Sequence, residues 1–169
     1  MKYGQTFGDL YDEILSRLKN EDFAVRQGDT EYPEWWNGTI TLYNKYIDDE
    51  NRRVIWYRHV LSGCYIGTKD VRSVNGSEIT LANTTVIRVP YSQIYIAHDS
   101  WDKSDARDDH ITFRVGDIIV KGECETEIDE NKSGSRSNDV ISNNSENAFV
   151  IKLFADNTNV SPRHYRIEG

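Results

Sequence analysis

The residues best suited to chemistry lie in one acidic stretch, residues 99–110, where five aspartates and one histidine fall within twelve positions. Carboxylates at this density could hold Ca²⁺ or Mg²⁺. The spacing nevertheless differs from that of an EF-hand loop, which needs glycine at its sixth position and glutamate at its twelfth. A solvated loop whose aspartates cap turns is the simpler interpretation, so we expect no metal site.

An acid–base arrangement could also be built here from His98, Asp102 and His110. No sequence signature marks a nucleophile beside these residues, and the chain has no Walker A, GxGxxG, HExxH or GxSxG pattern. Acid–base catalysis also needs a desolvated cleft that shifts pKa values, which a surface loop with so many charges does not supply. We therefore expect no catalytic residues, no cofactor and no enzymatic activity.

Composition limits the possible partners. The chain has 169 residues and a formal charge of −8, with 28 acidic and 20 basic side chains. That length suits one domain, or one domain with an arm, and a negative surface disfavours general nucleic-acid binding. No apolar run is long enough to cross a membrane and no signal peptide is recognisable, so we expect synthesis in a cytoplasm. In that reducing compartment, Cys64 and Cys124 are expected to be small buried hydrophobes.

The apolar pattern predicts helix first and strands afterwards. Residues 7–19 carry an apolar stripe at helical spacing, and this helix either packs on its own core or docks on a neighbouring subunit. From residue 39 the period changes to two, so residues 40–46 and 53–61 predict a β-hairpin. Further extended segments are expected at residues 64–67, 84–91, 111–115, 117–122, 149–154 and 164–167, with a hairpin turn at Asn75-Gly76.

The predicted fold class is therefore mainly β: a small antiparallel β-barrel or sandwich with an N-terminal α-helix and long loops. Residues 1–38 form an N-terminal helical arm, and residues 39–169 form a β-barrel-like domain. Within that domain, residues 123–147 make a long acidic loop whose composition predicts mobility, with one helical turn around Val140 and Ile141.

Contact surfaces are expected where aromatic or charged side chains are exposed. Adjacent tryptophans place one indole on each side of an extended chain, so one faces the core and the other a partner. The tip of the first hairpin and the acidic loop supply the remaining candidates. The predicted interface residues are Trp35, Trp36, Asp48, Asp49, Glu50, Asn51, Glu123, Glu125, Glu127, Asp129 and Glu130.

Three stretches together resemble a known family. They are residues 41–46 with 56–61, residues 116–123, and residues 155–158 with 162–165. In that order they resemble proteins from the structural gene clusters of phages of Gram-positive bacteria, a family that includes possible minor capsid or neck proteins. The resemblance covers roughly residues 39–169, and its motifs carry no assigned chemistry. The hairpin and barrel pattern also looks like the head-closure (stopper) proteins of long-tailed phages.

This resemblance implies a structural role in the virion. Stoppers form a six-subunit ring beneath the portal and adaptor rings, where they retain packaged DNA and join the tail. We therefore expect partners in further copies of this chain, in portal or adaptor proteins and in tail-terminator proteins, with DNA only as passing cargo. This chain is longer than typical stoppers, so a tail terminator or minor tail protein stays open. A carbohydrate- or receptor-binding module is the alternative of another class.

Overall fold

The computed structural model describes residues 32–75 and 78–169. Residues Pro33–Gly169 form one compact unit, which contains every described strand and helix. The helix predicted at residues 7–19 lies outside the described residues. Among the described residues, no helix is both long and apolar enough to span a membrane.

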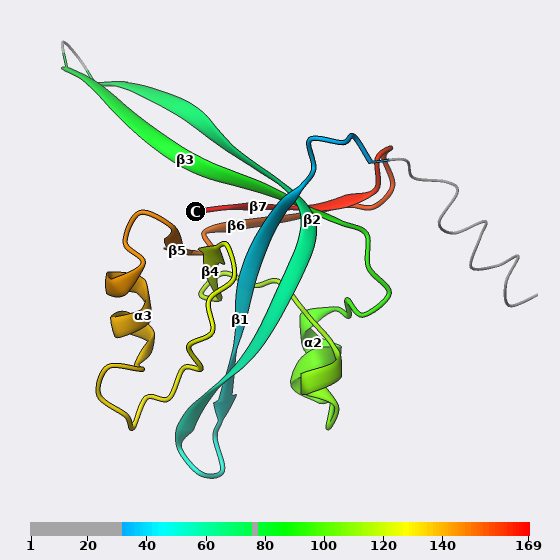
Figure 1. The fold of residues 1–169 in the computed structure, drawn as a ribbon, viewed down its shortest axis with the longest axis vertical. Helices are drawn as coiled ribbons and strands as arrows, with labels where there is room; N and C mark the ends of the chain where they lie inside the picture. The colour runs from blue at the N-terminus through cyan, green and yellow to red at the C-terminus, as the bar shows by residue number, and fades with distance from the viewer. Residues whose placement is uncertain (1–31, 76–77) are drawn as a thin grey trace, which may run out of the picture. The chain divides into compact units, whose positions relative to one another are not determined.

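Seven antiparallel strands form one curled sheet, a half-barrel, in the order β5-β4-β1-β2-β3-β7-β6 (Figure 1). This confirms the prediction of a mainly β, antiparallel fold. The edge strands β5 and β6 are consecutive in sequence, so the chain itself passes from one edge of the sheet to the other. The strands are β1 (Gly38–Asp48), β2 (Arg53–Asn75), β3 (Glu78–Pro90), β4 (Ile118–Lys121), β5 (Ala148–Val150), β6 (Leu153–Asn157) and β7 (His164–Glu168). The helices are α2 (His98–Asp102), the 3-10 helix η1 (Arg107–Asp109) and α3 (Ser137–Asn143).

The long strand β2 joins the two halves of the sheet. Its first part pairs with β1 up to Cys64, and its second part pairs with β3 from Tyr65 onward. Gly63 lies just before this junction, where the β1–β2 register shifts between the pairs Ile40↔Leu61 and Gly38↔Cys64, and its φ of 73° is a conformation that glycine adopts without steric cost. The prediction of a separate strand at residues 64–67 was therefore wrong, because Gly63 bends the strand without ending it.

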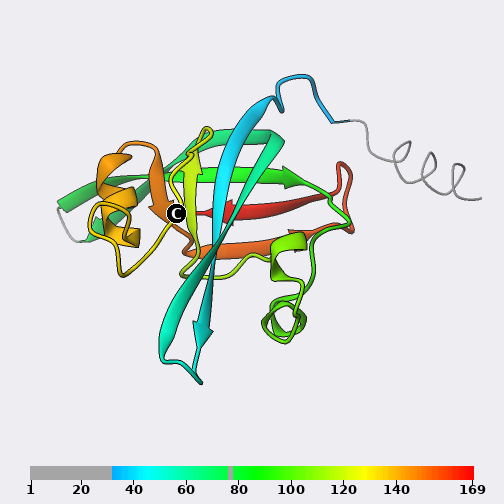
Figure 2. The same cartoon turned by 60° about the horizontal axis from the view of Figure 1, so that its bottom comes forward.

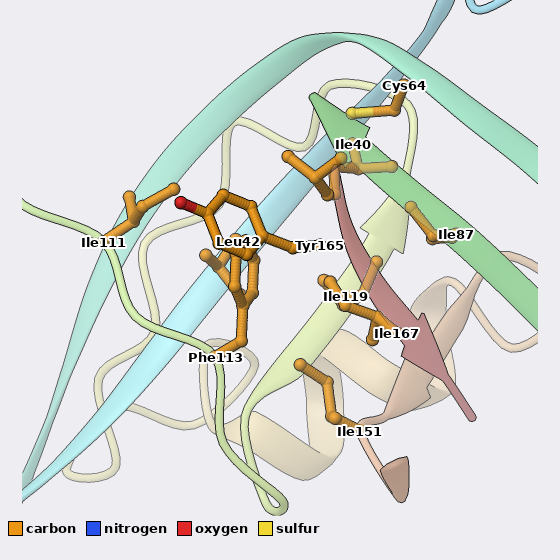
Figure 3. Close-up of a cluster of buried hydrophobic side chains, with 11 residues drawn as sticks. Ile40, Leu42, Cys64, Ile87, Ile111, Phe113, Ile119, Ile151, Tyr165 and Ile167 are labelled. Atoms are coloured by element: carbon orange, nitrogen blue, oxygen red, sulfur yellow. The ribbon is translucent and has the colours of Figure 1, made fainter. Parts of the chain in front are cut away.

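The main core fills the concave side of the sheet. Alternate residues of β1 point into it, and isoleucines of β3, β4 and β7 meet them there (Figure 3). The thiol of Cys64 is fully buried in this cluster, and burial raises its pKa to about 12. Cys124 is a free, half-buried thiol. Buried members of the cluster are Ile40, Leu42, Cys64, Ile87, Val89, Ile111, Phe113, Ile119, Ile151, Tyr165 and Ile167.

A second apolar cluster lies on the opposite face of β1 and β4. Tyr43, Ile118 and Val120 are buried there beneath Ile128 and Val140. The last two come from residues 123–147, so two apolar side chains anchor a segment whose composition predicted mobility. The predicted helical turn around Val140 is confirmed as α3.

Three other segments differ from the predictions in detail. Residues 111–115 form no strand; Ile111 makes a single bridge to Tyr95, and a turn follows. The extended segment expected at residues 149–154 is divided between two strands: β5 pairs with β4, and β6 forms a hairpin with β7. The hairpin at Asn75 is supported by its pairing with Glu78 across two residues that are not described.

Candidate interaction surface

The β1–β2 hairpin is covered on both faces by acidic segments (Figure 1). On one face, Trp56 Nε1 donates a hydrogen bond to Glu130 Oε1 at 2.8 Å. Arg58 Nε donates to the Cys124 carbonyl at 2.6 Å. These bonds hold residues 124–130 against β2, and they are possible because Trp56 and Arg58 lie two positions apart on one side of the strand.

Trp101 attaches the other acidic segment to the opposite face of the hairpin. Its indole is fully buried and meets the rings of Tyr57 and Tyr46 edge-on, with centroid distances of 5.5 and 6.3 Å. Its Nε1 donates to the His110 carbonyl at 3.0 Å. Residues 98–110 are therefore a packed cap, although their composition predicted a solvated loop. Sequence reasoning missed Trp101, whose only signal was one large apolar side chain among aspartates.

The hairpin tip combines one internal residue with exposed ones. Asp48 is largely buried and accepts hydrogen bonds from Asn51 and Arg53, at 2.8 and 2.9 Å from their side chains. The Asn51 hydrogen bond, followed by that of Arg53, holds the pKa of Asp48 below its usual value. Asp48 therefore closes the turn, and Asp49, Glu50 and Asn51 are left exposed for contact.

The predicted tryptophan pair separates as expected. A turn with Trp36 N donating to the Pro33 carbonyl at 2.9 Å precedes β1. Trp36 is only 7% exposed and packs edge-on against His164 at 5.7 Å. Trp35 is 68% exposed. Trp36 thus belongs to the core, and Trp35 alone can meet a partner.

The predicted acidic residues of the long loop lie beside the hairpin. Glu123, Glu125, Glu127 and Asp129 are exposed, and Glu130 is half-buried through its bond to Trp56. Residues 124–130 thus lie on one face of the β1–β2 hairpin, where Glu127 is 3.9 Å from Arg58, and the aspartates of residues 99–109 belong to the segment on the opposite face. Trp35 lies before the start of β1.

A polar cavity of about 340 Å³ opens beside the tip, lined by Tyr46, Ile47, Asp49, Asp102 and Arg114. The Arg114 guanidinium donates to the Lys45 carbonyl at 2.7 Å and contacts His98 Nε2 at 2.7 Å. His98 Nε2 also lies 3.1 Å from Asp102 Oδ2. The described residues that line the cavity include no serine, threonine or cysteine that His98 and Asp102 could activate as a nucleophile. Within residues 32–75 and 78–169, no three His, Cys, Asp or Glu side chains are grouped to hold a metal ion.

The curled sheet and these flanking segments lie within residues 35–169, which match the sequence profile of a family of unknown function (DUF6751). The chain belongs to this DUF6751 family. No curated protein and no solved structure matches the chain.

The DUF6751 match also includes a two-stranded extension of the sheet. Residues 68–75 of β2 and 78–84 of β3 pair with each other, and we call them the ribbon. β1 covers β2 only as far as Cys64, and β7 covers β3 only from Thr85. In the part of the chain that the structure describes, no third strand pairs with the ribbon, which leaves the body of the sheet in both views (Figures 1 and 2). Two-stranded hairpins are marginally stable alone in water, so the ribbon is suited to contact with another chain.

Proposed function

We propose that this protein is a structural component of a tailed-phage virion at the head–tail junction. It forms a ring that retains packaged DNA and joins the tail. The resemblance of residues 39–169 to phage structural-cluster proteins motivates this role, and the curled antiparallel sheet is compatible with the small β-barrels of stopper proteins.

The ribbon is the structural feature that favours a role in assembly. Because none of the described strands lies beside the ribbon as a third strand, it exposes rows of backbone N–H and C=O groups on both edges. Such edges gain hydrogen bonds when a neighbouring subunit lies against them, and contacts between identical subunits that close on themselves give rings. Self-assembly is therefore the activity that this fold supports best.

The acidic residues around the β1–β2 hairpin suit a channel that DNA passes through. Glu123, Glu125 and Glu127 are exposed, and their charge repels the phosphate backbone and prevents tight binding. Replacement of all three by glutamine would leave the buried anchors Ile128 and Val140 untouched. In phage carrying this variant, we expect folded protein and slower passage of DNA through the neck, because fewer charges repel the phosphate backbone; unchanged passage would argue against a channel lining.

Electron microscopy of lysates from a phage with a stop codon in this gene tests the proposal. Full-length tails lying separate from tailless heads, some of them emptied, would support a closure component of the neck. Tails of abnormal length would indicate a tail terminator instead. Intact virions that fail to adsorb would contradict both roles and favour receptor binding.

The exposed indole of Trp35 favours glycan or receptor binding as a second candidate, because aromatic faces stack on sugars. A glycan-array signal that is lost in Trp35→Ala would support it. Trp36→Ala cannot serve in this test, since Trp36 is a core residue whose loss would disturb the fold.

A further inference from the structure

The direction of the backbone groups along β3 follows from its contact with β7. Thr85 N donates to the Gly169 carbonyl at 3.1 Å, and Gly169 N donates to the Thr85 carbonyl at 3.2 Å. Successive residues of an antiparallel strand direct these groups to alternate sides. The β2–β3 register is continuous from Tyr65↔Arg88 to Asn75↔Glu78. The N–H and C=O groups of Ile79, Leu81 and Asn83 therefore point away from β2, to a side where no described strand lies.

The two edges of the ribbon differ in how many residues they carry that would prevent pairing with another strand. Exposed edge strands in monomeric proteins are usually blunted by charged residues, proline or bulges. The β2 edge carries Lys69, Asp70 and Arg72 within residues 68–75. Residues 78–84 of β3 carry one charge, Glu78, and contain no proline or glycine. The β3 edge is thus the one open to another strand.

We propose that a second copy of this chain adds its own β3 to this edge, antiparallel and related by a two-fold axis at Leu81. In this register Ile79 of each copy lies opposite Asn83 of the other, and the two Leu81 residues face each other. Every outward N–H and C=O of these residues then meets a partner. Glu78 lies opposite Thr84, so the two like charges stand at opposite ends of the pairing and do not repel each other closely.

A second copy fits this edge because the register centred on Leu81 pairs every outward group of Ile79, Leu81 and Asn83 and keeps the two Glu78 residues apart. A two-fold contact uses the same surface on both subunits and is complete in a pair. It joins copies in pairs, so a ring that contained it would be built from such pairs, with other surfaces completing the ring. This inference does not depend on the virion role.

Matched proline variants of the full chain test the edge. Asn83→Pro removes an N–H that points away from β2, so the internal ladder of the ribbon is retained. Asp70→Pro removes an N–H from the outer edge of β2, the opposite edge of the same ribbon. Light scattering coupled to size-exclusion chromatography should show wild-type protein and Asp70→Pro as even-numbered assemblies. Asn83→Pro should have a lower molar mass, half that of the wild type where the wild type is a dimer, with unchanged circular dichroism.

The position of the axis predicts a second result. Leu81→Cys in a Cys124→Ser background should form a disulfide-linked dimer with itself on mild oxidation, because residue 81 lies opposite its own copy. Cys124→Ser alone is the control and should stay unlinked. A wild-type monomer at the highest soluble concentration would overturn the inference, as would an Asn83→Pro assembly of unchanged mass. Equal loss of assembly in both proline variants would overturn the assignment to the β3 edge, while the proposed virion role would still be judged by the stop-codon phage.

Discussion

Asn44 and Asp117 form a hydrogen bond, Nδ2 to Oδ2, at 2.9 Å, with both side chains fully buried. The same carboxylate accepts from Lys45 N at 2.9 Å and from Arg114 N at 3.0 Å. Asn44 Nδ2 also donates to the Thr112 carbonyl at 2.7 Å. One buried carboxylate therefore fixes the turn before β4 against β1 and also positions Arg114 beside the cavity.

Asp117→Asn should destabilise the protein by about 1–3 kcal/mol. An amide has one acceptor oxygen, so its NH₂ group must face an N–H donor that the carboxylate oxygen accepted before. Urea denaturation of the variant and the wild type measures the loss. Asp156→Asn, at an exposed position of β6, is the control and should change stability little. Equal stability of wild type and Asp117→Asn would show that the network contributes nothing.

Stability should also depend on pH through this group. Burial raises the pKa of Asp117 to about 6, although its hydrogen bonds favour the charged form. Because the folded pKa of Asp117 lies above its unfolded value, the contribution of this group to the free energy of unfolding is fully present below about pH 4. It is lost as pH rises through about 6, and the loss is about 3 kcal/mol at most. Unfolding free energies of wild type and Asp117→Asn across pH 4–7 should therefore converge as pH rises. A constant difference would contradict the raised pKa.

Trp35→Ala and Trp36→Ala should separate contact from stability. Trp36 is buried against His164 and Tyr65, so its truncation should cost about 3–5 kcal/mol. Trp35 is exposed, and its truncation should change stability by less than about 0.5 kcal/mol. Thermal and urea denaturation of both variants provides the measurement. Similar losses in the two variants would mean that Trp35 also packs in the folded protein.

The strands were predictable where one local pattern determines them. Alternation in residues 40–46 and 53–61 identified the first hairpin, because buried and exposed positions alternate along a strand. Residues 64–67 were predicted as a separate strand, since the preceding glycine, Gly63, is compatible with either a break or a bend in a strand pattern. Only the pairing of Tyr65 with Arg88 shows that the strand continues.

The surface was predictable in composition but not in arrangement. The acidic candidates were visible as charge, yet nothing local indicates that Trp101 and Glu130 approach opposite faces of one hairpin. The role of Asp117 was not predicted, because its partner Asn44 lies 73 positions earlier in the chain. Such long-range polar contacts follow from the topology of the sheet, which no periodicity encodes.

Gly63→Ala should cost about 1–2 kcal/mol, because its φ of 73° brings an added Cβ close to the following carbonyl. An added Cβ would otherwise meet only loose contacts, the nearest at 3.8 Å, so the cost reflects backbone conformation. Gly63→Asn should lose less than the alanine variant, since asparagine tolerates left-handed backbone better. Denaturation midpoints of the two variants decide the matter; an alanine variant as stable as wild type would show that the bend does not require glycine.

Trp56→Phe should loosen the acidic segment while keeping the hairpin intact. Phenylalanine retains an aromatic ring against Lys45 but lacks the N–H that Glu130 Oε1 accepts at 2.8 Å. Because Glu130 is half-buried, the lost hydrogen bond should cost about 1 kcal/mol. Cleavage within residues 123–135 by a glutamate-specific protease should accelerate several-fold, since local opening exposes the segment. Glu130→Gln keeps an acceptor oxygen and should show a smaller acceleration. Equal cleavage rates in Trp56→Phe and wild type would mean that Arg58, through its bond to the Cys124 carbonyl, suffices to hold the segment.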